Sequence, residues 1–349
     1  MSRDLEQRYR RVLRLLPGYY RDKWEQDMVA AFLDSWLTGD PEDDEAILEY
    51  CKPTWQELAS VVSLAARLYL GTASAPRRYF AWGQAVRGAV LVLLLAHGAR
   101  ALDAFARLAW ARGLFGVPAP PANMVITPPS GTWTDVFYVV SYVWIMIFVL
   151  MLLGHYRTAR VITMLAIIPD LIALVQAQLT GTVQAPFGSW SFWVLLDLAM
   201  VLAMAAFYRD APPVARRPWL LALPAGYLLV YLPVLTVQVT GNARWLPDFA
   251  GLCCVLVALA CLAHAPRIWF RHNTGSGVWS LTLTLLAAVA GMYRLVSLGD
   301  YQNDPHLMTV SLAELLILVV AVALVAPDAA RAQTPMAVLP PHPHLERPI

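Results

Sequence analysis

The chain has 349 residues, of which 58% are hydrophobic and 14% are charged. Soluble domains are about 45–50% apolar and about 25% charged, so this composition excludes an ordinary soluble protein and indicates a chain that crosses a membrane several times. The formal net charge is +2, and the charged residues gather at the start of the chain and in short connections. We therefore expect no nucleic-acid partner.

The cysteines and basic residues do not indicate a specific chemical site. Three of the four cysteines, Cys253, Cys254 and Cys261, lie in one apolar segment without a paired spacing that suggests a metal site or a disulfide framework. Of the 26 basic residues only Lys23 and Lys52 are lysines. This preference for arginine over lysine is typical of a GC-rich bacterial genome. The sequence predicts neither a cofactor nor a metal site, and the basic N-terminus lacks the apolar core of a signal peptide.

Residues 1–75 combine many charges with apolar residues at helical spacing, which predicts a separate helical module. Pro17-Gly18 predicts a first break between helices. Asp40 followed by Pro41 predicts the start of a short acidic helix. The pattern Thr54 to Glu57 is that of a capping box and predicts a helix that extends to about Leu70. Three or four short helices result.

Eight apolar stretches of about 20 residues, the length of a membrane-spanning helix, follow from Arg77 onward. They cover approximately residues 80–100, 134–154, 160–180, 190–208, 219–239, 248–266, 278–298 and 307–326. The first run continues past Arg100 through Asp103 and Arg107, and we expect that continuation to form an amphipathic turn along the membrane surface.

Arginines flank one alternating set of connections, and the opposite set carries few basic residues apart from the long 101–133 connection. The positive-inside rule then places both termini in the cytoplasm of a bacterial plasma membrane. The proline-rich residues 328–349 are expected to be a disordered cytoplasmic tail. The sequence thus predicts an all-α protein: a cytoplasmic module (1–75), a polytopic bundle of about eight transmembrane helices (76–327) and the tail.

Three carboxylates fall near the middle of predicted spans: Asp170, Asp197 and Glu314. An acidic residue at a helix centre costs about 2.5–3.5 kcal/mol on insertion scales, so these side chains should face the bundle interior or water. Arg294 lies in the span before Glu314, and its long side chain can reach Glu314 if the two helices pack as a hairpin.

Two interpretations of these charges stay open. Asp170 and Glu314 either form a proton or cation site or accept hydrogen bonds that hold helices together. For Asp197 and Arg294 the sequence favours a structural role, although both belong to the candidate substrate- or proton-binding set. His97 and His264 lack a second ligand at helical spacing, and we expect them to be interfacial hydrogen-bonding residues.

One segment carries a resemblance to known proteins. Residues 8–36 contain Leu15-Leu16-Pro17, the pair Tyr20-Arg21, and Glu25 to Met28 before an apolar helix. This segment resembles the N-terminal prefix of a group of actinobacterial multi-pass membrane proteins and the helical prefix modules that precede some ABC-type permeases. The resemblance covers about the first fifth of the chain. It implies a cytoplasmic helical module ahead of a membrane body and supplies no catalytic residues.

The sequence supports two functional hypotheses. In the first, the protein is a transporter or transport-associated protein whose buried carboxylates line a site. In the second, it is a membrane-anchored signalling or assembly protein whose residues 1–75 bind a cytoplasmic protein. An intramembrane enzyme is the least favoured interpretation, because no nucleophile and base lie at a shared depth. The lipid bilayer is the partner that both hypotheses require, and the sequence does not indicate an oligomeric state.

Overall fold

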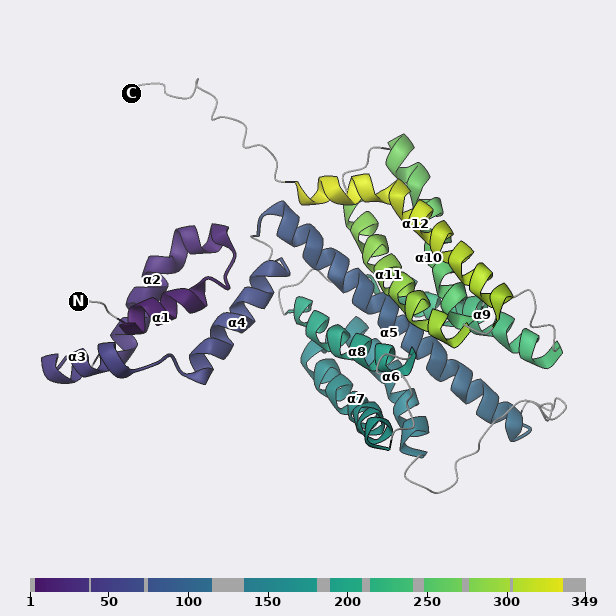
Figure 1. The fold of residues 1–349 in the computed structure, drawn as a ribbon, viewed down its shortest axis with the longest axis horizontal. Helices are drawn as coiled ribbons and strands as arrows, with labels where there is room; N and C mark the ends of the chain where they lie inside the picture. Colours follow the sequence, from purple (N-terminus) through teal and green to yellow (C-terminus); the bar gives the residue numbers. More distant parts are fainter. Residues whose placement is uncertain are drawn as a thin grey trace.

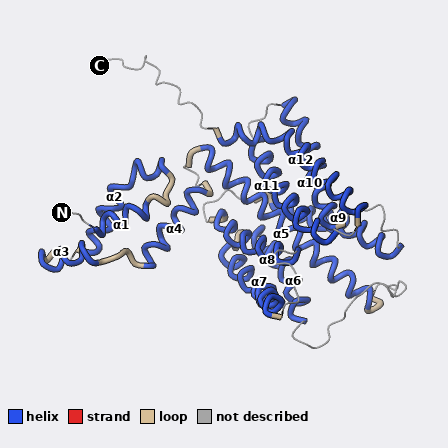
Figure 2. Tube along the Cα trace, in the orientation of Figure 1, coloured by secondary structure: helices blue, strands red, loops and turns tan. Residues whose placement is uncertain are grey.

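The computed structural model describes residues 4–37, 39–71, 75–114, 135–180, 189–208, 214–240, 248–271, 276–301 and 304–334. Within these ranges the structure is helical and contains no strand, so the prediction of an all-α fold is confirmed (Figure 2). The helices are α1 (Asp4–Leu13), α2 (Gly18–Trp36), α3 (Pro41–Tyr50), α4 (Trp55–Tyr69), α5 (Arg77–Ala111), α6 (Asp135–Leu153), α7 (Tyr156–Leu179), α8 (Ser189–Ala203), α9 (Arg216–Thr240), α10 (Phe249–Arg271), α11 (Ser276–Ser297) and α12 (Pro305–Gln333). Short 3-10 helices follow α8 (η1, Met204–Ala206) and α11 (η2, Leu298–Tyr301).

Helices α1 to α4 pack around an apolar core of their own and lie to one side of the remaining helices (Figure 1). The predicted breaks are present, since Pro17 precedes α2 and Pro41 begins α3. The ring of Tyr9 stacks on that of Phe32 with centroids 3.9 Å apart. The core consists of Leu5, Tyr9, Leu13, Leu16, Val29, Phe32, Val61, Ala65 and Leu68.

The predicted capping box opens α4. The backbone N–H of Glu57 donates to Thr54 Oγ1 at 3.3 Å, and the backbone N–H of Thr54 donates to Glu57 Oε2 at 2.6 Å. The other carboxylate oxygen of Glu57 accepts a hydrogen bond from Trp36 Nε1 at 2.8 Å. Glu57 therefore caps α4 and also ties it to the end of α2.

Replacing Glu57 with alanine should lower the free energy of unfolding of the α1–α4 core by about 1–2 kcal/mol, because the change removes a helix cap and leaves the Trp36 N–H without its acceptor. Thermal unfolding followed by tryptophan fluorescence measures this loss. Glu49→Ala, in the neighbouring α3, is the matched control and should shift stability by less than about 0.5 kcal/mol. An equal loss in both variants would contradict the assignment.

Each of the eight predicted apolar stretches coincides with a helix, from α5 to α12. Five segments of the described chain are long and apolar enough to cross a membrane, namely residues 77–111, 156–176, 249–269, 277–297 and 305–333. Residues 142–153 and 191–206 form shorter apolar helical segments. These helices suggest insertion into a lipid bilayer. The count of eight spans and the orientation of the termini stay predictions.

Two boundaries differ from those expected. Helix α5 continues without a break to Ala111, so the expected surface turn around Asp103 and Arg107 is instead the last part of a 35-residue helix. Helix α12 extends to Gln333, so residues 328–333 belong to a helix and not to the tail. Buried contacts explain the second difference, because Ala329 packs in a core with Ala81 and Ala85 of α5. The tail beyond residue 334 lies outside the described residues.

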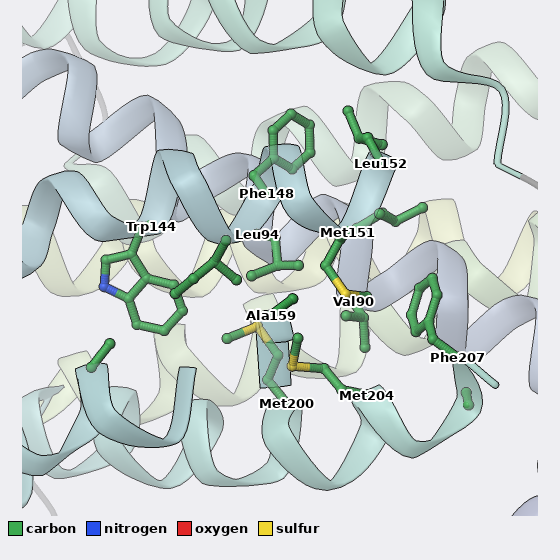
Figure 3. Close-up of a cluster of buried hydrophobic side chains, with 14 of the residues drawn as sticks. Val90, Leu94, Trp144, Phe148, Met151, Leu152, Ala159, Met200, Met204 and Phe207 are labelled. Atoms are coloured by element: carbon green, nitrogen blue, oxygen red, sulfur yellow. The ribbon is translucent and has the colours of Figure 1, made fainter. Parts of the chain in front are cut away.

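Helix α5 lies at the centre of the bundle and contacts α6, α8 and α9 as well as α11 and α12 (Figure 1). On one side, residues of α5 to α8 share a large apolar core in which Val90 and Leu94 face Trp144, Phe148 and Met151 of α6 (Figure 3). On the other side, α10, α11 and α12 share a second core that includes Cys254, Cys261, Leu318 and Val325. The bundle thus consists of two packed groups of helices that meet along α5.

Large apolar side chains are exposed along the outer faces of α7 and α12. In α7 the exposed residues are Val161, Met164, Leu165, Ile168, Ile172, Val175 and Leu179, and in α12 they are Leu307, Leu312, Leu316, Ile317, Val319, Val320 and Leu324. Faces of this length and apolarity are unfavourable in water and suit contact with lipid chains. They agree with an integral membrane protein.

The helices α1 to α4 are joined closely to the bundle. Gly71 adopts a positive φ of 74°, a conformation that favours glycine. The hydroxyl of Tyr208 donates a hydrogen bond to the carbonyl oxygen of Gly71. Gly83 of α5 lies against the backbone of Leu70, where an added Cβ would overlap the carbonyl oxygen of that residue. The end of α4 is therefore held directly against α5.

Two arginines hold the end of α8 in place. Arg87 of α5 is buried, and its Nε donates to the carbonyl oxygen of Ala206 at 2.7 Å. Arg160 of α7 donates from a terminal nitrogen to the carbonyl oxygen of Met204, also at 2.7 Å. The carbonyl oxygen of Met204 also accepts from the backbone N–H of Phe207 at 3.0 Å, so Arg160 adds a second donor there, while Arg87 supplies a donor to Ala206 at the helix end.

Candidate functional site

A cavity of about 320 Å³ lies in the bundle where α5 meets α8, α9, α10 and α11. Its lining residues are Ala96, His97, Arg100, Asp103, Arg107, Trp193, Tyr231, Phe249 and Tyr293. This volume is at the lower end of the range for small-molecule sites, about 300–1,000 Å³. Residues from both packed groups of helices therefore surround one small space.

Helix α5 supplies the charged side of the cavity. His97, Arg100, Asp103 and Arg107 are spaced by three or four residues, which places them along one face of the helix. Arg107 Nε donates to Asp103 Oδ2 at 2.6 Å. The second oxygen of Asp103 is buried and has no hydrogen-bond partner within the described part of the chain. Continuation of α5 past Arg100 is thus what brings this charged stripe to the cavity.

Aromatic rings from four other helices form the opposite side. Trp193 of α8 lies with its ring centroid 5.0 Å from that of Tyr293 of α11 and 6.1 Å from that of Phe249 of α10. Tyr231 of α9 lies 5.8 Å from Phe249, centroid to centroid. Aromatic pairs at these distances support one another and hold the rings in place. The wall is apolar and suits a flat ligand.

His97 and Asp197 form a buried pair beside the cavity. His97 Nε2 lies 2.8 Å from Asp197 Oδ1, and both side chains are at least 90% buried. The imidazole ring stacks on Trp144 with centroids 4.1 Å apart. His97 thus makes a polar contact, as expected, but it is buried within the bundle, and its position at the membrane interface stays a prediction. The pair agrees with the structural role that the sequence favours for Asp197.

Arg294 holds two carboxylates. Its NH1 nitrogen donates to both oxygens of Asp248, at 2.7 and 2.8 Å, and its NH2 nitrogen lies 2.5 Å from Glu314 Oε2. The expected contact between Arg294 and Glu314 is thus present, and α11 and α12 pack side by side. Gly251 leaves room for the Glu314 carboxylate, because a Cβ at that position would overlap its oxygens. Two residues of the cavity lining, Phe249 and Tyr293, are the sequence neighbours of Asp248 and Arg294.

Asp170 lies apart from Glu314. It is half-buried on α7 and interacts electrostatically with Arg100 and His97 of α5 and with Asp197 of α8. The partners of Glu314 belong to α10 and α11 instead. The structure therefore does not bring these two predicted site residues into one cluster. The carboxylate that lines the cavity is Asp103, which sequence reasoning assigned to a surface turn.

A second polar group connects α10, α11 and α12. Ser280 Oγ donates to Asp328 Oδ2 at 2.8 Å, and His264 Nε2 lies 3.2 Å from Ser280 Oγ. His264 is buried and makes the hydrogen-bonding contact that was expected of it, while its interfacial position stays a prediction. The serine lies between the histidine and the carboxylate and gives its proton to the carboxylate. In a catalytic triad the histidine occupies the middle position and accepts the serine proton, so this order does not activate Ser280.

The described part of the chain contains no group of three or more histidine, cysteine or acidic side chains that could hold a metal ion. Within the same part, the four cysteines are free. The cavity is therefore the feature of the described structure that best suits a ligand, and its lining suits an organic molecule better than a metal.

The spacing of the charged residues on α5 was the signal that could have found the cavity. His97, Arg100, Asp103 and Arg107 follow a helical period, but the charges suggested that the membrane span ended at Arg100. The aromatic residues gave no signal, because Trp193, Tyr231, Phe249 and Tyr293 lie in four separate segments of the sequence. Only the packing of these helices around α5 and against one another brings the four rings together.

Comparisons of the chain with models of protein families, with curated proteins and with solved structures find no match. The resemblance of residues 8–36 to prefix modules of membrane proteins therefore stays a prediction.

Proposed function

We propose that the protein is a membrane transporter for a small organic solute, which binds in the cavity beside α5. The observation that carries this proposal is the position of the cavity between two helix groups that each have an apolar core of their own. Transporters of several folds bind their substrates where two rigid groups of helices meet, because rocking of one group against the other opens the site to alternate sides.

The predicted topology supports an opening toward the outside. His97 to Arg107 lie in the half of α5 that leads to the predicted outer connection, and Trp193 and Phe249 follow predicted outer connections directly. Tyr293 lies just before another predicted outer connection. Arg87, Arg160 and the cluster of His264, Ser280 and Asp328 lie toward the opposite ends of their helices. In this orientation the outer half of the bundle holds the cavity and the inner half is closely packed.

Cysteine labelling tests this proposal. Ala96 lines the cavity and is small, so Ala96→Cys in a chain whose four native cysteines are changed to serine or alanine should react with a membrane-impermeant maleimide. We expect labelling from the outside in whole cells and, at a slower rate, from the cytoplasmic side in inside-out vesicles. Mass spectrometry of the purified chain measures both.

Val90→Cys is the matched control, since Val90 lies on the same helix but is buried in the apolar core. It should stay unlabelled from both sides. Ala96→Cys that reacts from neither side would show that water does not reach the cavity and would overturn the proposal.

A second function is favoured by the contact between α4 and α5. Gly71 and Gly83 bring the end of α4 against the start of the helix that carries the charged stripe. A ligand that moves α5 would therefore move α1 to α4 as well, as a membrane-anchored signalling protein with a cytoplasmic protein partner requires. Labelling of Ala96→Cys from the outside alone would favour this function over transport.

A further inference from the structure

We propose that the cavity recognises a small organic carboxylate that has a flat apolar body and a hydrogen-bond donor, with aromatic amino acids as the model class. This inference rests on the proposed function, because it names the class of solute that would occupy the same cavity. Three properties of the lining carry it: an arginine that makes no ion pair among the described residues, a buried carboxylate oxygen without a hydrogen-bond partner among them, and a wall of aromatic rings.

One exposed arginine of the lining, Arg100, is available to an anionic group. Arg107 is matched by Asp103 at 2.6 Å, and His97 has the Asp197 carboxylate at 2.8 Å. Arg100 interacts electrostatically with Asp170, but within the described structure it makes no ion pair or hydrogen bond. A guanidinium presents a planar set of donors that matches a carboxylate in two parallel hydrogen bonds. Arg100 is therefore the group that we assign to the anionic end of the ligand.

The unpartnered oxygen of Asp103 favours a donor on the ligand. Asp103 is only 8% exposed, and its Oδ1 has no hydrogen-bond partner among the residues that the structure describes. Buried carboxylate oxygens are normally hydrogen-bonded, because the loss of hydration is otherwise not compensated. An amino or hydroxyl group next to the ligand carboxylate would reach Asp103 while the carboxylate contacts Arg100, since the two residues are three apart on one helix face.

The remaining lining selects for a flat apolar body. Trp193, Tyr231, Phe249 and Tyr293 face the charged stripe across the cavity. Their π faces favour an aromatic ring or an organic cation over an aliphatic chain. A volume of about 320 Å³ accommodates a molecule of amino-acid size.

Three related indole compounds separate the contribution of the ligand's carboxylate to binding from that of its ammonium group. L-Tryptophan carries a carboxylate and an ammonium group, indole-3-propionate keeps only the carboxylate, and tryptamine keeps only the ammonium group. We expect tryptophan to bind the purified full chain in detergent most tightly, by isothermal titration calorimetry. Loss of the carboxylate should weaken binding about tenfold or more, and loss of the ammonium group should weaken it severalfold.

Arg100→Gln should reduce the affinity for tryptophan and indole-3-propionate about tenfold and leave that for tryptamine unchanged. Arg112→Gln is the matched control, because Arg112 is exposed at the end of the same helix and does not line the cavity. Its affinities should equal those of the unmodified chain. An unchanged elution volume in size-exclusion chromatography shows that each variant is folded.

Equal binding of tryptamine and tryptophan, or binding of none of the three compounds, would overturn the carboxylate assignment. Neither result would decide the proposed function, which depends on labelling of Ala96→Cys from the two sides of the membrane. Failure of the ligand class and failure of the proposed function are therefore separate outcomes.

Discussion

Replacing Arg294 with methionine is expected to lower the free energy of unfolding by about 3–5 kcal/mol, the range found when one partner of a buried ion pair is removed. Arg294 contacts Asp248 and Glu314, and the two carboxylates differ in their access to water. The side chain of Asp248 is 34% exposed and can be rehydrated, whereas that of Glu314 is 7% exposed. The cost arises mainly because Glu314 would be left buried and unpaired.

Reversible unfolding of the purified chain in mixed micelles, followed by circular dichroism, measures this change. The double variant Arg294→Met, Glu314→Gln should recover a large part of the loss, because it removes the unpaired charge together with its partner. Arg331→Met is the control on α12, where Arg331 is exposed, and should change stability by less than about 0.5 kcal/mol. If Arg294→Met costs under 1 kcal/mol, the cluster does not stabilise the fold.

Replacing Gly83 with alanine is expected to cost about 1–3 kcal/mol and to loosen α1 to α4 from the bundle. The added Cβ would overlap the backbone carbonyl oxygen of Leu70, and backbone atoms cannot move aside as a flexible side chain can. An extra methyl group forced into a closely packed region typically lowers the free energy of unfolding by about 1–3 kcal/mol. Alanine is the better helix former by about 0.5–1 kcal/mol, which offsets only part of the loss.

Thermal unfolding and limited proteolysis together test this prediction, since the variant should release a fragment with α1 to α4 faster than the unmodified chain does. Gly226→Ala in α9 is the matched control. There the nearest atom to an added Cβ is Leu95 Cδ2 at 3.7 Å, an ordinary van der Waals distance. Gly226→Ala should be neutral or slightly stabilising. Similar proteolysis of both variants would contradict a close joint at Gly83.

The ion pair between Arg294 and Glu314 was predictable because it depends on two neighbouring helices. A hairpin of consecutive helices leaves few ways to place two residues that lie near its turn. The same holds for the capping box of Thr54 and Glu57, which depends on four consecutive residues. By contrast, the partner of His97 is Asp197 of α8, which is not a sequence neighbour of α5, and neither segment alone indicates this pairing.

The sequence by itself determined the all-α class, the breaks near Pro17 and Pro41, and the eight apolar segments, because these depend on composition and on local periodicity. Only the tertiary structure decided that α5 continues through Asp103 and Arg107, since the energy that keeps charged residues in a helix comes from the neighbours against which they pack. It also decided that Trp193, Tyr231, Phe249 and Tyr293 face that helix. A cavity formed by five helices depends on contacts between distant segments, and hydrophobic patterns specify that a helix is buried but not which helix it meets.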